Sequence, residues 1–132
     1  MDQRPTKREI DKRLKEAKQA LREGKGAYAN AAKISGELTA LNVFDATRLW
    51  ELILRLMEEI TLDDYEGAHP PQKSREPAIA DCELWAFAWN SSLLKKRMYL
   101  KFAVYEGIFY YVSLHKSKFL EEGTYEMSEM HE

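Results

Sequence analysis

The sequence lacks the cysteines and the long apolar runs that are typical of disulfide-rich, metal-binding or membrane-embedded proteins. Its 132 residues include one cysteine, Cys82, which excludes an intramolecular disulfide and a cysteine metal cluster. No apolar run reaches the roughly 18 residues that a membrane helix needs, and no secretory leader pattern is present. We therefore expect a soluble, cytoplasmic protein with no membrane partner.

Sequence motifs for bound cofactors are missing as well. The chain has no glycine-rich phosphate loop, no dinucleotide fingerprint and no Gly-x-Ser-x-Gly elbow. Its three histidines, His69, His115 and His131, lack the spacing of metal ligands. Glu58 and Glu59 are interpreted as a solvated pair on an exposed helical face. We expect neither a cofactor nor a metal ion.

Charge is nearly balanced overall but is strongly segregated along the chain. The net charge is -2, whereas residues 91–118 sum to +5 and residues 119–132 to -5. A local basic surface can therefore meet a polyanion even though the whole protein is slightly acidic.

The N-terminal half has helical patterns. Thr6 and Glu9 form a capping box, which predicts a helix beginning at Lys7. A short second helix is expected within residues 27–41, and Asp45 is a predicted N-cap for a third, strongly apolar helix.

The C-terminal half begins with a loop and has strand patterns after it. Residues 61–81 hold three of the four prolines, which predicts a stiff, exposed loop. Residues 84–89 are apolar on both sides, which favours a strand in the middle of a sheet. Helices followed by strands indicate an α+β fold, with N-terminal helices packed on one face of a small C-terminal antiparallel sheet. We expect one domain over residues 1–118 and a flexible acidic tail over residues 119–132.

A β-hairpin is predicted over residues 97–118, because two β-rich runs flank Gly107. A three-residue loop, 105–107, is favoured because it separates apolar from polar side chains. This register pairs Tyr99 with Ser113 and Lys101 with Tyr111. The face expected in the core carries Met98, Leu100, Phe102, Val104, Ile108, Tyr110, Val112 and Leu114. The second face carries Tyr99, Lys101, Ala103, Phe109, Tyr111, Ser113 and His115.

This part of the chain resembles the MqsR-type ribonuclease toxins of bacterial toxin–antitoxin pairs. The match is a strand with Tyr99, Leu100 and Lys101, a hairpin return ending near Leu114, and Trp85 placed 14 residues before the tyrosine. The resemblance implies a RelE-like α+β fold, cleavage of messenger RNA, and a protein antitoxin that neutralises the toxin.

Two positions depart from the pattern of the family. Ala86 stands where the family has a glutamine after the tryptophan, and Gly67 stands where it has a catalytic-type lysine. Lys73 or Arg75, in the longer loop, can substitute for that lysine.

Our first hypothesis is therefore a metal-independent endoribonuclease. Such cleavage needs a base for the 2′-hydroxyl, cations for the charged phosphorane and an acid for the leaving oxygen. His115 can act as acid or base, because histidine changes charge nearest to neutral pH. Candidate catalytic residues are Tyr99, Lys101, His115 and Lys73. Candidate substrate-binding residues are Arg75, Trp89, Arg97, Tyr111 and Ser113, of which Trp89 or Tyr111 can stack on a base.

An alternative of another class stays open. The same face can belong to a regulatory module that binds RNA or a protein partner without catalysis, and the missing lysine and glutamine favour it. Likewise, the 61–81 loop is either a phosphate-holding segment or a plain surface loop.

Overall fold

The computed structural model describes residues 4–43 and 45–117. The predicted acidic tail, residues 119–132, lies outside the described residues. The elements, in chain order, are α1 (Lys7–Arg22), β1 (Gly26–Tyr28), η1 (Ala31–Lys33), α2 (Ser35–Ala40), α3 (Ala46–Met57), η2 (Leu62–Asp64), η3 (Pro77–Ile79), β2 (Trp85–Ser91), β3 (Lys96–Tyr105) and β4 (Ile108–Lys116).

The predicted helix starts are confirmed by their caps. Thr6 and Glu9 form the reciprocal capping box at the start of α1, and the Asp45 side chain accepts a hydrogen bond from the Thr47 amide at the start of α3. The segment expected to form one short helix divides into β1, η1 and α2. Strand β1 has only three residues, too few for a periodic pattern.

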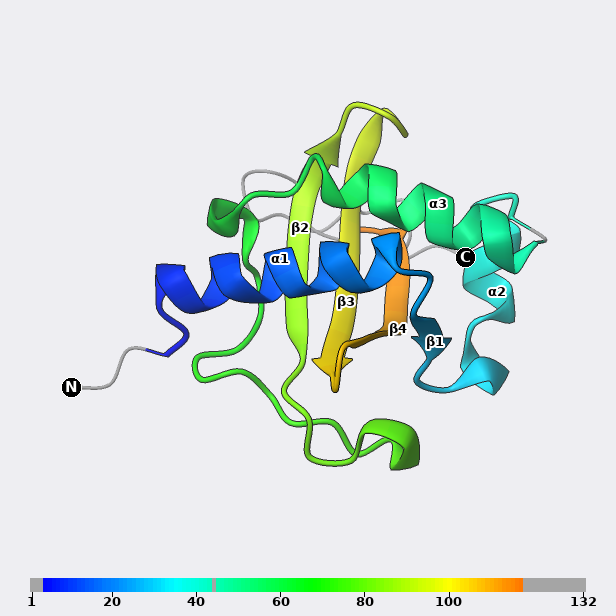
Figure 1. Ribbon diagram of the computed structural model, residues 1–132. Coiled ribbons are helices and arrows are strands. Elements are labelled where there is room, and N and C mark those ends of the chain that lie inside the picture. The colour runs from blue at the N-terminus through cyan, green and yellow to red at the C-terminus, as the bar shows by residue number, and fades with distance from the viewer. Residues whose placement is uncertain (1–3, 44, 118–132) are drawn as a thin grey trace, which may run out of the picture.

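The strands form one four-stranded sheet in the order β1-β4-β3-β2 (Figure 1). The α+β class is confirmed, with helices first and the main strands afterwards. Because β1 comes from the N-terminal half and pairs parallel with β4, the sheet is mixed. Strand β2 lies at an edge, so its predicted place in the middle of the sheet is wrong. Its residues are nevertheless buried on both faces, from Trp85 to Trp89.

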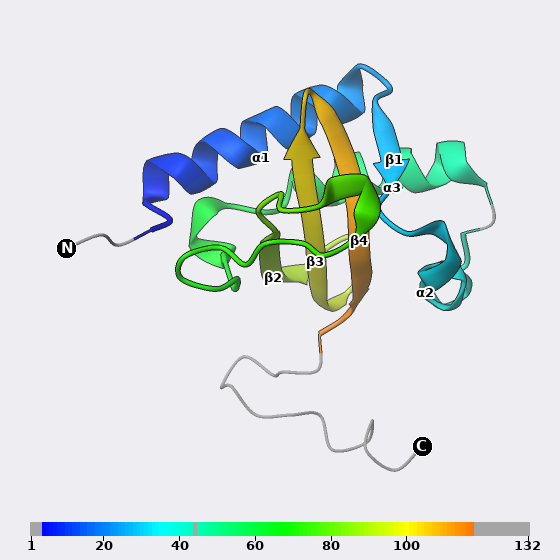
Figure 2. The same cartoon turned by 90° about the horizontal axis from the view of Figure 1, so that it is seen from below.

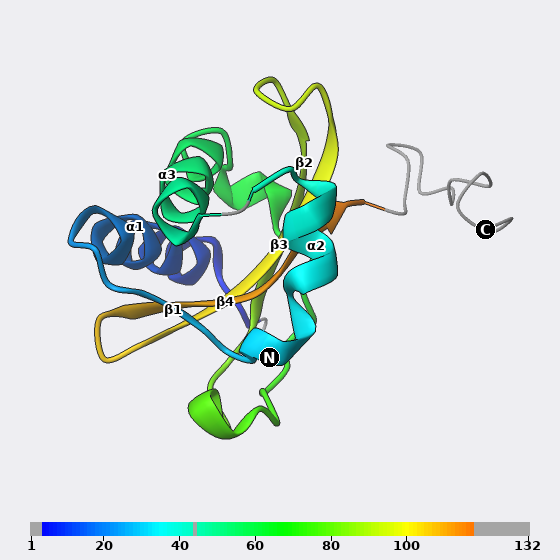
Figure 3. The ribbon, with the colours of Figure 1, turned by 90° about the vertical axis from the view of Figure 1, so that its right-hand side faces the viewer.

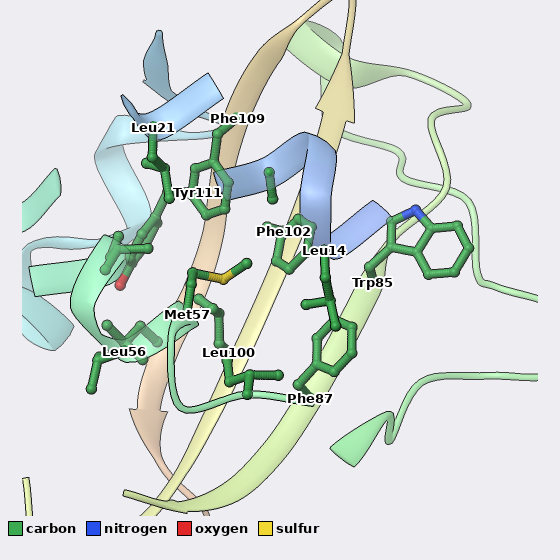
Figure 4. Packing of buried hydrophobic residues seen from close by; sticks show 14 of the residues in the cluster. Leu14, Leu21, Leu56, Met57, Trp85, Phe87, Leu100, Phe102, Phe109 and Tyr111 are labelled. Atoms are coloured by element: carbon green, nitrogen blue, oxygen red, sulfur yellow. The ribbon is translucent and has the colours of Figure 1, made fainter. Parts of the chain in front are cut away.

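Helices α1 and α3 lie together on one side of the sheet (Figure 3). Their apolar stripes, including Leu14, Leu21, Leu56 and Met57, pack on the sheet (Figure 4). On the sheet side, the rings of Phe87, Phe102 and Phe109 stack across β2, β3 and β4, with centroid separations of 5.8 and 5.1 Å. The main core therefore lies between the two helices and this side of the sheet.

The hairpin turn differs from the prediction. Tyr105 pairs with Ile108, so the loop has two residues, Glu106 and Gly107, and the three-residue loop is wrong. Both loop residues have positive φ, 51° and 76°, as in the type I′ turns that match the twist of a hairpin.

A β-bulge follows the turn. Phe102 pairs with Tyr111, whereas the preceding residue, Lys101, pairs with Ser113, so Val112 is an extra residue in β4. The predicted pairs of Tyr99 with Ser113 and of Lys101 with Tyr111 are therefore wrong. The sequence alone disfavours a two-residue turn because, without a bulge, such a turn mixes polar and apolar residues on each face.

The two-residue turn also changes which residues of β4 are in the core before the bulge, and the bulge returns Leu114 to the core side. Leu114 and the β3 residues Met98, Leu100 and Phe102 are buried there, as predicted. For Ile108, Tyr110 and Val112 the prediction is wrong, and Phe109 and Tyr111, both 0% exposed, take their place.

The other side of the sheet is covered near the hairpin turn by the segment that carries η3. Ile79 packs there with Ala29 and Ala103 in a second small cluster, to which Tyr110 and Val112 add. Figure 2, which looks from the hairpin end, shows this green segment lying across β3 and β4. Among the described residues, no helix has the length and apolar character needed to cross a membrane.

Candidate functional site

Five of the nine predicted site residues lie on the side of the sheet that faces away from α1 and α3. Met98, Leu100 and Phe102 point into the main core, so alternation along β3 turns the residues between them to the opposite side. Beyond the bulge, the residues flanking Leu114 do the same on β4. We call this group the polar face: Arg97, Tyr99, Lys101, Ser113 and His115.

Two aromatic side chains stack at the centre of the polar face. Tyr99 and His115 are cross-strand partners, and their rings lie 5.1 Å apart between centroids with an interplanar angle of 19°. His115 Nδ1 lies 2.9 Å from the carbonyl oxygen of Lys116. Since a carbonyl only accepts, Nδ1 carries the hydrogen, and in the neutral ring Nε2 is the free acceptor. His115 is thus oriented to take a proton through Nε2.

The polar face carries two cations, Lys101 and Arg97. Within residues 4–43 and 45–117, neither Lys101 nor Arg97 forms an ion pair. Arg97 Nη1 reaches Asn90 Oδ1 at 3.5 Å, while its Nε is buried without a hydrogen-bond partner among the described residues. A cation without a carboxylate partner suits a phosphate oxygen.

The environment of Tyr99 keeps its hydroxyl in the protonated form. Burial raises the pKa of its phenol, and the negative charge of Glu66 adds to the shift. Glu66 is held near β2 by a hydrogen bond of 2.8 Å from its amide to the Ala86 carbonyl. The hydroxyl of Tyr99 therefore stays protonated at neutral pH.

Small residues of β2 lie beside this group. Ala86 pairs with Lys101 and Ala88 with Tyr99, so the position where the resemblance expects a glutamine lies next to the site. Gly67, where the resemblance expects a lysine, has no room for a side chain in this structure. A Cβ at Gly67 would lie 2.6 Å from Tyr65 Oη. That hydroxyl donates to the Ala68 carbonyl, so it is fixed in place.

Trp89 and Tyr111 do not belong to the polar face, so their predicted role in stacking on a base is wrong. Both are buried, at 3% and 0% exposed, on the side of the sheet that packs against the helices. Trp89 Nε1 donates to Glu59 at 2.9 Å, and the Tyr111 hydroxyl donates to Glu37. For Trp89 a signal was available, because a strand that alternates Trp and Phe with Ala turns its large residues towards the larger core.

Lys73 and Arg75 lie elsewhere. Lys73 forms a backbone bridge with Glu83, and the next residue, Ser74, donates to the Cys82 carbonyl. These bonds hold residues 73 and 74 beside the chain just before β2, near the turn between β3 and β4. Among the described residues, no hydrogen bond or ion pair joins either cation to the polar face. Their predicted cooperation with Lys101 on one phosphate is therefore not formed in this structure.

Two glutamates of the site were missed from the sequence. Glu66 acts on Tyr99 through its charge, and Glu37 accepts a hydrogen bond from Ser113 Oγ at 2.7 Å. Neither forms part of a motif, and Glu37 lies 76 residues before Ser113, so no local pattern connects them.

In residues 4–43 and 45–117, no group of three or more His, Cys, Asp or Glu side chains is close enough to hold a metal ion. Comparisons of the chain with family models, curated proteins and solved structures find no match.

Proposed function

We propose that the protein is a metal-independent endoribonuclease that cleaves cytoplasmic messenger RNA on the polar face. The observation that carries the proposal is that two cations without ion pairs in the described residues, Lys101 and Arg97, share one face of the sheet with the stacked rings of Tyr99 and His115. These groups match in type the base, cation and acid that RNA cleavage without a metal requires. The resemblance to MqsR-type toxins supports the same reaction and adds a protein antitoxin as the partner that silences it.

In this reaction His115 Nε2 removes the proton of a ribose 2′-hydroxyl. The 2′-oxygen attacks the adjacent phosphorus, and the bond from phosphorus to the 5′-oxygen breaks. Lys101 and Arg97 stabilise the negative charge of the phosphorane. The Tyr99 phenol donates its proton to the leaving 5′-oxygen. The products are a 2′,3′-cyclic phosphate and a free 5′-hydroxyl, and the proton held by His115 restores Tyr99 through solvent.

A second candidate is a module that binds RNA or a protein partner on the polar face without cleaving. The pairing of Ala86 with Lys101 favours it, because a polar group expected from the resemblance is missing beside the cation. The closed position at Gly67 has the same implication.

Cleavage of a mixed-sequence, single-stranded RNA in EDTA decides between these functions. We expect Lys101→Ala and Tyr99→Phe each to lower the rate about a hundredfold or more, because each removes a group that acts on developing charge. Lys15→Ala is the matched control, since Lys15 is an exposed cation on α1 that pairs with Asp11. Identical purification of all variants controls for contaminating nucleases.

Wild-type rates in both Lys101→Ala and Tyr99→Phe contradict the nuclease proposal. RNA that is bound but left intact by the wild-type protein favours the second candidate.

A further inference from the structure

Strand β4 loses its neighbouring strand halfway along its outer edge. Strand β1 ends at Tyr28, and the amide of the next residue, Ala29, donates to the Tyr111 carbonyl at 2.9 Å. In the described residues no strand pairs with β4 on that side beyond this point. An exposed edge of this kind leaves backbone donors without partners.

Glu37, from the first turn of α2, occupies this edge. Its Oε1 accepts hydrogen bonds from the Tyr111 hydroxyl and from the Leu114 amide, the latter at 2.9 Å. Its Oε2 accepts the Ser113 hydroxyl at 2.7 Å. Burial and the bond to Glu37 raise the pKa of Tyr111, so that hydroxyl remains a donor.

The position of Glu37 is itself fixed by packing. Ile34, which precedes α2, is 5% exposed in the main core, and Leu38 and Leu41 pack against the same core. The carboxylate is therefore anchored through α2 to the helix side of the sheet, while it binds donors on β4.

The three donors surround Val112, the extra residue of the bulge. Tyr111 precedes Val112, and Ser113 and Leu114 follow it. Without the extra residue, the register set by the turn would continue, and Leu114 in place of His115 would lie opposite Tyr99. His115 would then face the helices. The bulge is thus what brings His115 beside Tyr99 and Ser113 beside Lys101.

We propose that Glu37 is a positioning residue, which holds the bulge at Val112 and thereby places His115 and Ser113 on the polar face. It acts by accepting hydrogen bonds, so a neutral side chain with the same acceptor geometry can replace it. The effect on RNA cleavage rests on the proposed function, whereas the effect on the position of His115 does not.

The structural test is nuclear magnetic resonance on variants of the full chain. In the wild type we expect nuclear Overhauser effects between the rings of Tyr99 and His115 and slow exchange of the Leu114 amide. Glu37→Leu should lose the ring contact and exchange Leu114 at least tenfold faster. Glu37→Gln should keep both, because its amide oxygen accepts the Leu114 amide and its nitrogen donates to the Ser113 hydroxyl.

Glu76→Gln is the matched control. The Glu76 side chain accepts hydrogen bonds from Asn30 and Lys33, which lie just before α2, and within the described residues it forms no hydrogen bond to β4. Glu76→Gln should leave both the contact between the Tyr99 and His115 rings and the Leu114 exchange rate unchanged. Tyr111→Phe is the fallback if Glu37→Leu does not fold. It removes a single donor to Glu37 and keeps the ring in the core, so the Leu114 amide should exchange at a rate between those of the wild type and Glu37→Leu.

A ring contact between Tyr99 and His115 that persists in folded Glu37→Leu, or an unchanged Leu114 exchange rate in Tyr111→Phe, overturns the proposal. In the cleavage assay, Glu37→Leu should lower kcat at least tenfold with KM changed less than threefold, because Lys101 and Arg97 are on β3. A kcat per folded molecule equal to wild type also overturns it. If the wild type does not cleave RNA, the proposed function fails while the resonance experiment still tests Glu37.

Discussion

Glu59, which follows the end of α3, binds Trp89 of β2 and the turn between β2 and β3. Its replacement by glutamine should destabilise the protein markedly. One carboxylate oxygen accepts a hydrogen bond from Trp89 Nε1 at 2.9 Å, and the other accepts a hydrogen bond from the Leu93 amide at 2.8 Å. Glutamine has one acceptor oxygen, so one of these donors is left facing an amide nitrogen. Trp89 is only 3% exposed, and water cannot easily replace the lost partner. The expected loss is about 1 to 3 kcal/mol in the free energy of unfolding.

The neighbouring residue provides the control. Glu58 forms an ion pair with Arg22 at 2.9 Å, but its side chain is 54% exposed. Glu58→Gln should therefore cost less than about 1 kcal/mol. Urea unfolding at pH 7 compares the two variants, and equal losses would refute this account of Glu59.

The loss should also depend on pH. Burial opposes ionisation of Glu59, but hydrogen bonds from Trp89, Ser91 and Leu93 outweigh it and lower the pKa of the folded carboxyl below 4.5. Its contribution to stability is thus complete above the unfolded pKa and disappears as the pH falls through the lower folded pKa. The difference in free energy of unfolding between the wild type and Glu59→Gln should therefore decrease from pH 7 to pH 3. A difference that stays constant over this range would contradict the reasoning.

Two further substitutions test the packing. Leu100→Ala empties a site that is 0% exposed in the main core and should cost about 2 to 5 kcal/mol in urea unfolding, so an unchanged midpoint would contradict the assigned face of β3. Gly26→Ala places a Cβ 2.8 to 2.9 Å from the Trp50 ring, so it should destabilise the β1 edge; the loss should diminish in the double variant with Trp50→Leu, and equal losses would show that the ring is not the obstacle.

Local signals allowed the helix starts and the strands of the hairpin to be predicted. The Thr6 and Glu9 capping box and the Asp45 cap act within three residues of their partners, so the sequence alone contains them. On β3, the alternation of Met98, Leu100 and Phe102 with polar residues identified both the core and the polar face.

Interactions between distant residues explain the errors. The register of β4 depends on a bulge whose donors bind Glu37, 74 to 77 residues earlier in the chain. The helical pattern likewise predicted that Glu58 and Glu59 are both solvated. That is wrong for Glu59, whose partners come from residues 30 or more positions later.

The most direct test of the central claim is to locate bound RNA on the protein. A short single-stranded oligonucleotide with 2′-deoxy sugars keeps the phosphates and bases but lacks the attacking hydroxyl, so it binds without being cleaved. Titration of the labelled protein, followed by chemical shifts, should perturb Arg97, Tyr99, Lys101 and His115 first, and Lys101→Ala should weaken the binding. Perturbations confined to the basic exterior of α1, with the polar face unchanged, would contradict the account.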